Sequence, residues 1–428
     1  MSKIAIDLSP LKKYPDFRNL WTAGLISYIG SMITYVALPF HLKEITGSYL
    51  AVGILGVIEI VPLIIFGLYG GVLADAVDRK KMIWATEAGA LLIVLILLIN
   101  STLPNPETFV IYVAAALFAM VDGLQRPSMG AILPRLVSHE DLPSASALLT
   151  LRWQFGVIVG PTLGGIIFST MSITAGYAVD IATYLVSLVF LMKVRNIPPL
   201  KEAEKPSLAS LLEGIRYACS RQDLLATYVI DLAAMFFAMP NALFPFWADL
   251  LGSPWALGLF YSAGIVGAVA VTLTSGWTKH YRFHGKAIIW AAIGWGAAIA
   301  IAGLSNSLIL VLICLALAGA SDQVSAHFRS VIWNQTIPDN LRGRLAGIEL
   351  LSYSIGPLAG QMRAASMAAA TSLSFSVTSG GVVCVVVVVI LAILMPKFRK
   401  YDAETNEYAI RERETRKNRE ITDEIEEK

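Results

Sequence analysis

Charged residues are scarce in this sequence. Only 15% of its 428 residues are Asp, Glu, Lys or Arg, whereas soluble domains carry about 25%. The formal net charge is +2, and the basic residues are concentrated between apolar runs, which argues against a nucleic-acid-binding face. Because 56% of the residues are hydrophobic, we expect most of the chain to be solvated by lipid.

Cysteine is also rare, and no ligand set is recognisable. The three cysteines, Cys219, Cys314 and Cys384, show no CxxC or Cys/His spacing, so the sequence supports neither a disulfide framework nor a metal site. It contains no HExxH, GxSxG or phosphate-cradling glycine loop. We therefore expect no catalytic residues, no cofactor and no enzymatic activity. The amino-terminal residues lack the features of a cleaved secretory signal, so we expect them to be retained.

Long apolar runs are the main feature of the sequence. A membrane-spanning helix needs about 20 apolar residues, and each half of the chain contains six runs of roughly that length. The sequence thus predicts an all-α integral membrane protein with twelve transmembrane helices. The runs are Leu20 to Phe40, Leu50 to Leu73, Met82 to Ile99, Thr108 to Gln125, Ala145 to Phe168, Ile173 to Met192, Leu224 to Trp247, Trp255 to Trp277, Ala287 to Leu304, Leu308 to Val331, Leu345 to Met367 and Ser372 to Met395.

Two polar segments divide the chain. Residues 195–222 form the longest polar interruption, and residues 397–428 are densely charged. We interpret residues 1–194 and 223–396 as two six-helix bundles. The first polar segment is then a cytoplasmic linker with an amphipathic helix near Leu208 to Tyr217, and the second is a solvated helix or a disordered tail.

The basic residues indicate the orientation in the membrane. Positively charged loops are retained in the cytoplasm. If both termini lie inside, only Lys43 and Arg363 of the 33 lysines and arginines fall on the outer side. The sequence therefore predicts a multi-pass protein with both termini in the cytoplasm, which we expect to be a monomer.

The connection after the second span carries a motif. It reads Gly71-Val72-Leu73-Ala74-Asp75-Ala76-Val77-Asp78-Arg79-Lys80-Lys81, and it resembles the loop signature of the major facilitator superfamily. The resemblance implies that Gly71, Asp75, Arg79 and Lys80 form a conformational-switch loop. A basic loop that only sets orientation is the alternative. The corresponding loop of the second half has His280 in place of the Asp, as in a degenerate internal repeat.

Small residues recur at helical spacing in the fifth span. The pattern G-x-x-x-G-P-x-x-G-G resembles the antiporter signature of the same superfamily, and part of it returns in the eleventh span. Such residues let another helix approach closely, while the proline bends the span. Generic helix packing explains the glycines alone, but poorly explains two Gly-Pro copies in corresponding spans. The residues are Gly156, Gly160, Pro161, Gly164 and Gly165, with Gly356 and Pro357 in the eleventh span.

Further segments are similar to the branch of the superfamily that includes enterobactin and macrolide exporters. They are Asp16 to Trp21, Ala131 to Val137 with Glu140 to Leu142, and Pro338 to Arg344. The resemblance implies the major facilitator fold in a bacterial inner membrane, and export of a siderophore or amphipathic drug-like compound by alternating access with proton influx. An uncoupled facilitator or a lipid flippase is the alternative. Drug antiporters usually carry R-x-x-Q-G in span four, whereas here Asp122 replaces the Arg.

Ionisable side chains inside the predicted spans are candidates for function, because a charge in hydrocarbon is costly. Asp122 and Asp322 occupy equivalent positions in the two halves, and Glu59 lies in the middle of the second span. We expect at least one of these three acids to bind a proton during transport. The structural alternatives are a salt bridge between Asp122 and Arg126 and a bracing hydrogen bond from Glu59.

Other side chains of the spans are candidates for a cavity that binds a small-molecule substrate. Methionine and aromatic residues of the seventh span could form an apolar wall, although packing is their commoner role. Asp180 and Arg152 lie close to predicted span ends, where solvation is the commoner explanation. The cavity candidates are Tyr28, Gln125, Asp231, Met235, Phe236, Tyr261, Gln323, His327, Glu349 and Tyr353.

Reporter fusions test the predicted orientation. Because nearly all basic residues fall on one side, a fusion after Lys43 and a fusion after Lys400 are expected to report opposite compartments. A phosphatase that is active only outside the cytoplasm should be active after Lys43, and a protein that fluoresces only inside should fluoresce after Lys400. Both reporters on the same side would overturn the orientation.

Overall fold

The computed structural model describes residues 7–198 and 216–426. All regular secondary structure in these residues is helical. Lipid offers no hydrogen-bond partners, so a spanning segment satisfies its backbone groups internally by forming a helix. The side chains of residues 68, 71–72, 74–76, 130–131, 339–340, 342–344, 346–348, 350–351, 416 and 418–426 lie outside the description.

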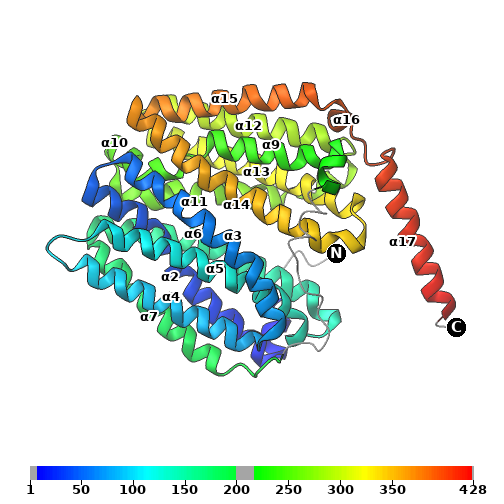
Figure 1. Cartoon of the computed structure of the whole chain (residues 1–428), viewed down its shortest axis with the longest axis horizontal. Coiled ribbons are helices and arrows are strands. Elements are labelled where there is room, and N and C mark those ends of the chain that lie inside the picture. Colours follow the sequence, from blue (N-terminus) through cyan, green and yellow to red (C-terminus); the bar gives the residue numbers. More distant parts are fainter. Residues whose placement is uncertain (1–6, 199–215, 427–428) are drawn as a thin grey trace. The chain divides into compact units, whose positions relative to one another are not determined.

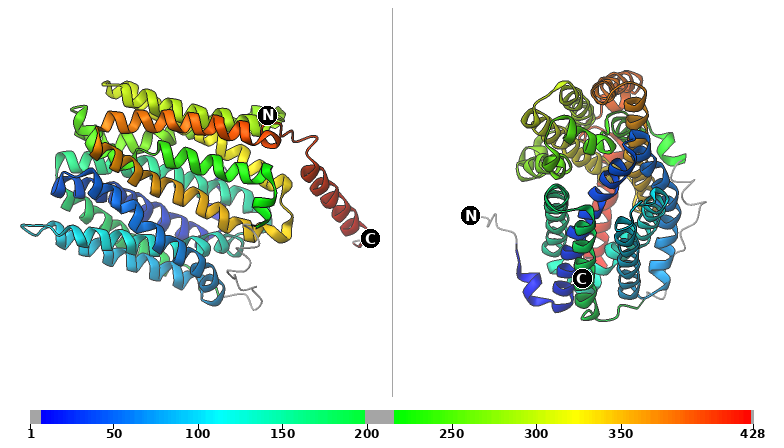
Figure 2. Two further views of the ribbon diagram at one scale, coloured as in Figure 1. Left: turned by 45° about the horizontal axis from the view of Figure 1, so that its top comes forward. Right: turned by 90° about the vertical axis from the view of Figure 1, so that its left-hand side faces the viewer.

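The helices follow one another with short connections. In Figures 1 and 2 the long helices α2 to α7 run side by side along their lengths. The elements of the first half are α1 (Ser9–Lys13), α2 (Pro15–Thr46), α3 (Tyr49–Ala76), α4 (Arg79–Ser101), α5 (Thr108–Leu136), η1 (His139–Asp141), α6 (Leu142–Thr170) and α7 (Ile173–Met192). Those of the second half are α9 (Gln222–Ala238), η2 (Asn241–Leu243), α10 (Phe244–Leu250), η3 (Pro254–Ala256), α11 (Leu257–Leu273), η4 (Ser275–His280), α12 (His284–Leu304), α13 (Leu308–Thr336), α14 (Asp339–Ala370), α15 (Leu373–Leu394), α16 (Pro396–Arg399) and α17 (Glu407–Glu426).

Eleven segments within the described residues are long and apolar enough to cross a membrane. The twelfth span is α14, which has 32 residues and carries Glu349 and Arg363 within its length. The predicted all-α fold with twelve transmembrane helices is confirmed. The seventh span differs from the predicted continuous helix, because α9 ends at Ala238 and Pro240 follows. Met239 is extended, with φ −97° and ψ 104°, as expected for a residue before proline.

The described helices pack into two compact units. The first consists of Met1–Pro206, Asn241–Ile265 and Ala365–Leu373, and the second of Ser207–Pro240, Val266–Ala364 and Ser374–Lys428. The sequence prediction places residues 241–265 in the second six-helix bundle. In the structure they belong to the first compact unit. The division into bundles at residues 194 and 223 stays a prediction from the sequence. Most of the predicted linker helix lies outside the described residues.

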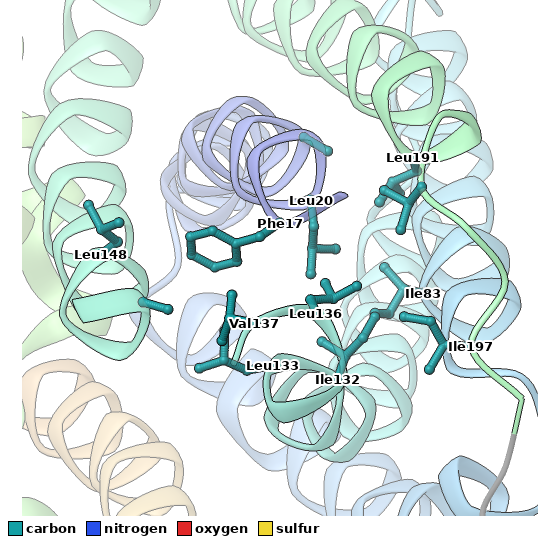
Figure 3. Packing of buried hydrophobic residues seen from close by; sticks show 13 residues of the cluster. Phe17, Leu20, Ile83, Ile132, Leu133, Leu136, Val137, Leu148, Leu191 and Ile197 are labelled. Carbon is teal, nitrogen blue, oxygen red and sulfur yellow. The ribbon is translucent and has the colours of Figure 1, made fainter. Parts of the chain in front are cut away.

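An apolar core of the first unit gathers five of its helices (Figure 3). Phe17 at the start of α2 is 0% exposed and packs with Ile83 of α4 and Leu136 of α5. Leu148 of α6 and Leu191 of α7 complete the contact. This core fixes the ends of the helices relative to one another, and it includes the segment before the first span that carries the sequence resemblance.

The two Gly-Pro motifs lie at close helix crossings. A Cβ on Gly160 of α6 would lie 2.4 Å from the Cβ of Met32 and 2.7 Å from the carbonyl oxygen of Ile29, both in α2. In the second unit, a Cβ on Gly360 of α14 would lie 2.5 Å from the carbonyl oxygen of Met235 in α9. The fifth span, α6, thus packs closely on the first, α2, and the eleventh span, α14, packs closely on the seventh, α9. The same pair of positions is in contact in each half, which agrees with an internal repeat.

The start of the charged tail is docked on the second unit. Arg221 donates a hydrogen bond of 2.8 Å to the carbonyl oxygen of Thr336, and its guanidinium carbon lies 3.6 Å from the ring centroid of Tyr408. Burial disfavours the charged guanidinium, but hydrogen bonds and the negative charge of Asp223 outweigh it and raise the pKa of Arg221. The tail is therefore not solvated throughout, because Tyr408 at the start of α17 is held against the ends of α9 and α13.

Replacing a crossing glycine tests this packing. Gly160→Ala is expected to lower stability by about 1 to 3 kcal/mol, the usual cost of overpacking, because backbone atoms of α2 cannot move aside cheaply. Thermal unfolding of the purified protein measures the effect. The matched control is Gly276→Ala, since a Cβ on Gly276 meets nothing within 4 Å. Equal melting temperatures of the two variants would contradict the close crossing.

Candidate functional site

The second unit buries opposite charges where α9, α13 and α14 meet. Arg329 forms an ion pair with Asp231, and their side chains are 9% and 4% exposed. The Nη2 atom of Arg329 lies 3.8 Å from Oδ1 of Asp322. Ser352 donates a hydrogen bond of 3.2 Å to Oδ2 of Asp231. With Glu349, these four residues form what we call the Arg329 cluster.

Glu349 is the third acid of the Arg329 cluster. It interacts electrostatically with both Arg329 and Asp231. One guanidinium therefore faces three carboxyl groups on three helices. Buried charges are tolerated when they are paired, and one cation cannot neutralise three anions. Asp322 has a 39% exposed side chain, and Arg329 engages it less closely than it engages Asp231.

Arg329 is a residue that the sequence prediction missed. It follows Asp322 by two helical turns on α13, so the two side chains share one face. Its Nε atom is buried and has no hydrogen-bond partner in the described part of the chain. A signal was present, because Arg329 falls inside the predicted span Leu308 to Val331.

In the first unit, Asp122 is engaged by a basic partner. Its Oδ2 atom lies 2.6 Å from the Nη2 atom of Arg126 one turn further along α5, and both side chains are close to half exposed. The salt bridge considered for this acid is thus present. Glu59 of α3 interacts electrostatically with Asp122 and with Tyr35. The structure brings these two coupling candidates together and places Asp322 in the other unit.

Glu87 of α4 is held by neutral donors from three helices. Its Oε1 atom accepts hydrogen bonds from Gln125 (3.0 Å) and Ser27 (3.2 Å), and its Oε2 atom accepts one from Ser187 (3.0 Å). Arg152 of α6 adds an electrostatic attraction. Gln125, which the sequence predicted to line a substrate cavity, therefore donates its side-chain hydrogen bond to Glu87.

Asp180 of α7 contradicts the expectation of a solvated span end. Its exposure is 0%, and it accepts a hydrogen bond from Thr34 of α2. Arg152 is also not simply solvated, because its Nη1 atom is buried against Gly24. Burial of these two groups depends on how α2 packs with α6 and α7, which the position of a residue within a span does not reveal.

The other cavity candidates lie in both units and mostly pack against protein. Tyr28 lies over Gly156, where a Cβ would come within 2.3 Å of its ring. Tyr261 donates a hydrogen bond of 3.2 Å to the carbonyl oxygen of Asn241. Met235 packs against Gly356, while Phe236, Gln323 and His327 are partly buried and Tyr353 is 45% exposed.

A cavity of the second unit lies away from these residues. It has a volume of about 670 Å³ and is lined mostly by apolar residues of α11, α12 and α13, among them Trp290 and Leu317, with Trp277 of η4. None of the predicted cavity residues lines it. The sequence analysis selected polar, aromatic and methionine residues inside the spans. It could not identify this cavity, because most of the lining residues are apolar side chains that are common in every span.

The loop motif after the second span contacts the end of α7. The side chains of Gly71 and Asp75 lie outside the description. Arg79 is buried, and its N–H donates to the carbonyl oxygen of Ile197 at 3.1 Å. Lys80 donates a long hydrogen bond of 3.4 Å to the carbonyl oxygen of Met192. The basic part of the motif therefore ties α4 to the chain segment that leaves α7.

Repeated helix crossings and ionisable groups buried between spanning helices are features of membrane transporters. The sequence matches the family described as transmembrane secretion effectors over residues 5–420. The chain belongs to this family, within the major facilitator superfamily and its enterobactin-exporter branch. It is a multi-pass efflux transporter of the bacterial inner membrane.

Similar proteins cover almost the whole chain. Enterobactin exporter EntS of Shigella boydii serotype 18 is 27% identical over 397 residues, 92% of this chain and 95% of that protein. EntS of Citrobacter koseri is 26% identical over the same shares. The nucleoside transporter NupG has a TM-score of 0.69 at 12% identity, and a bacterial homologue of the iron transporter ferroportin has 0.69 at 15%. These structures cover 90% of this chain, with 100% and 98% of their own lengths matched, and show the fold.

The Arg329 cluster predicts unequal costs for its acids. Asp231→Asn is expected to destabilise the protein by about 3 to 5 kcal/mol, because it removes the closest and most buried partner of Arg329. Asp322→Asn should cost much less, since its side chain is 39% exposed and lies farther from the guanidinium. Thermal unfolding and protein yield of the two variants are the measurements. Equal losses would show that Arg329 depends on both acids alike.

Proposed function

We propose that the chain exports a siderophore or an amphipathic drug-like molecule across the inner membrane by alternating access, with coupling to proton influx. The observation that carries the coupling is the Arg329 cluster, in which three carboxyl groups share one guanidinium between α9, α13 and α14. The names of the relatives, enterobactin exporters, support the class of substrate.

Asp322 is the acid of the cluster best suited to carry the coupled proton. When it is ionised, it competes with Asp231 for Arg329. When it is protonated, the competition ends and Arg329 is left to Asp231 alone. One proton thus changes the attraction between α13 and α9, and a ligand that changes the relative energy of two conformations shifts their populations. Glu59 and Asp122 remain further candidates of the first unit.

The substrate side of the proposal combines polar and apolar contacts. Tyr353, which is 45% exposed, and the partly buried Gln323 and His327 offer groups that could bind a polar end. Phe236 and other aromatic residues of the seventh span offer an adaptable wall for a bulky apolar part. We also propose a monomer with both termini in the cytoplasm and with the loop from Gly71 to Lys80 as its conformational switch.

An uncoupled facilitator or a lipid flippase is the second candidate. The charged cluster then serves only to hold α9, α13 and α14 together. This alternative is favoured by the apolar lining of the cavity between α11, α12 and α13, which could accept an acyl chain. Transport that does not respond to a proton gradient, or translocation of a fluorescent lipid, would support it.

Transport by purified protein in proteoliposomes tests the coupling. With an imposed pH gradient, the native protein is expected to move enterobactin or a macrolide against its concentration gradient. Asp322→Asn should abolish this uphill transport and keep downhill exchange, because the amide retains its size but cannot titrate. Glu404→Gln, an exposed acid of the tail, is the matched control and should transport normally. If the single amides of Glu59, Asp122 and Asp322 all transport uphill, the coupling group lies elsewhere or protons do not drive the protein.

A further inference from the structure

Polar side chains of α2 and α7 lie along the contact between these two helices inside the first unit. Ser31 and Tyr184 share a hydrogen bond of 2.7 Å, and Nδ1 of His41 lies 3.1 Å from the hydroxyl of Tyr177. At about 1.5 Å per residue, these side chains span about 21 Å from the first to the last residue on α2. We call this set of side chains the α2–α7 seam. Its members are Ser27, Ser31, Thr34 and His41 on α2 and Tyr177, Asp180, Thr183, Tyr184 and Ser187 on α7.

Asp180 in the middle of the seam has the hydrogen-bond surroundings of a neutral acid. Thr34 donates to its Oδ2 atom. Thr183 lies 2.7 Å from the backbone carbonyl oxygen of Asp180 and 3.2 Å from its Oδ1 atom. A hydroxyl has one hydrogen, and the shorter contact takes it. The lone pairs of Thr183 then face Oδ1, so one carboxyl oxygen meets a donor and the other meets an acceptor.

Glu87, at one end of the same seam, has the opposite surroundings. All three of its hydrogen bonds, from Ser27, Gln125 and Ser187, come from donors, and Arg152 attracts it. Three donors and a nearby cation offset part of the cost of burying a negative charge at Glu87. The contrast shows that the fold distinguishes two buried acids that the same two helices help to hold.

Within the part of the chain that the structure describes, no cation acts on Asp180. The acid that acts on it is Glu87, which repels a second negative charge. The other ionisable groups that face the seam are His41 on α2, Arg152 on α6 beside Glu87, and Tyr177 and Tyr184 on α7. In the described residues Asp180 forms no ion pair. An isolated carboxylate in such a site is strongly disfavoured.

Gly30 lets the backbone of α2 close over the acid. A Cβ at this position would lie 2.4 Å from Oδ1 of Asp180 and 1.9 Å from Oγ1 of Thr183. The exposure of Asp180 is accordingly 0%. Proton exchange therefore needs either separation of α2 from α7 or passage along the hydroxyl and imidazole groups of the seam.

We propose that Asp180 is a proton-binding site of the first unit, distinct from the coupling candidates Glu59, Asp122 and Asp322. A proton added to Oδ1 gives a carboxylic acid that donates to Thr183 and accepts from Thr34 at Oδ2. The role of this proton in transport rests on the proposed function. The presence of the proton on Asp180 does not depend on the proposed function. An experiment can therefore reject either the site or its role in transport without rejecting the other.

Infrared spectroscopy of the purified native protein tests the site directly. A buried carboxylic acid has a carbonyl stretch that is separate from carboxylate bands and shifts in D2O. Asp180→Asn is expected to remove one such band and to leave thermal stability at or above the native level, because the amide reproduces one donor and one acceptor. Glu404→Gln, an exposed control, should leave the band in place. Persistence of every carboxylic band in Asp180→Asn would overturn the proposal.

A second variant keeps the test decisive if Asp180→Asn does not accumulate. Thr183→Val removes the acceptor and leaves the acid, so the Asp180 band should remain and move to higher frequency as its hydrogen bond is lost. An unmoved band would overturn the proposal. Proteoliposome transport separates the consequences. A band lost in Asp180→Asn together with unchanged proton-driven export would establish the site and exclude its role in coupling.

Discussion

Polar groups between the spanning helices depend on partners within the protein, because the surrounding hydrocarbon offers none. This constraint makes all regular structure of the described chain helical, and it also governs the side chains. Asp231 is held by Arg329 and Ser352, and Glu87 by three neutral donors and the charge of Arg152. These partners come from different helices, so the same contacts that satisfy the charges also fix the packing.

Close helix crossings bring the partners of these contacts within reach of one another. Glycines of α6 bring its backbone against α2, and glycines of α14 bring it against α9. Gly30 does the same between α2 and α7, directly beside Asp180. The break at Pro240 coincides with the boundary between the compact units. The part of the seventh span after this break packs with the first unit, where Ser262 of α11 also donates a hydrogen bond of 2.9 Å to the carbonyl oxygen of Ile158.

The buried acids differ in what a proton would change. In the Arg329 cluster a proton on Asp322 alters competition for one guanidinium, and the effect is transmitted to α9 through Asp231. In the α2–α7 seam a proton completes a local hydrogen-bond pattern and removes a charge that no cation offsets. Asp122 differs again, since Arg126 on the same helix already pairs with it. The position of an acid in a span is thus a weaker guide to its chemistry than the groups that surround it.

The sequence by itself determined the number of spans, the helical class and the family, because hydropathy and short motifs are local properties that survive without knowledge of packing. It also located the Gly-Pro segments and picked out Asp231, Asp322 and Glu349 as unusual. Only the tertiary structure decided that Arg329 joins these three acids and that Asp180 is sealed between helices. Partners such as Thr34 and Asp180 are far apart in the chain, and whether an acid meets a donor, an acceptor or a cation depends on the rotation of each helix against its neighbours.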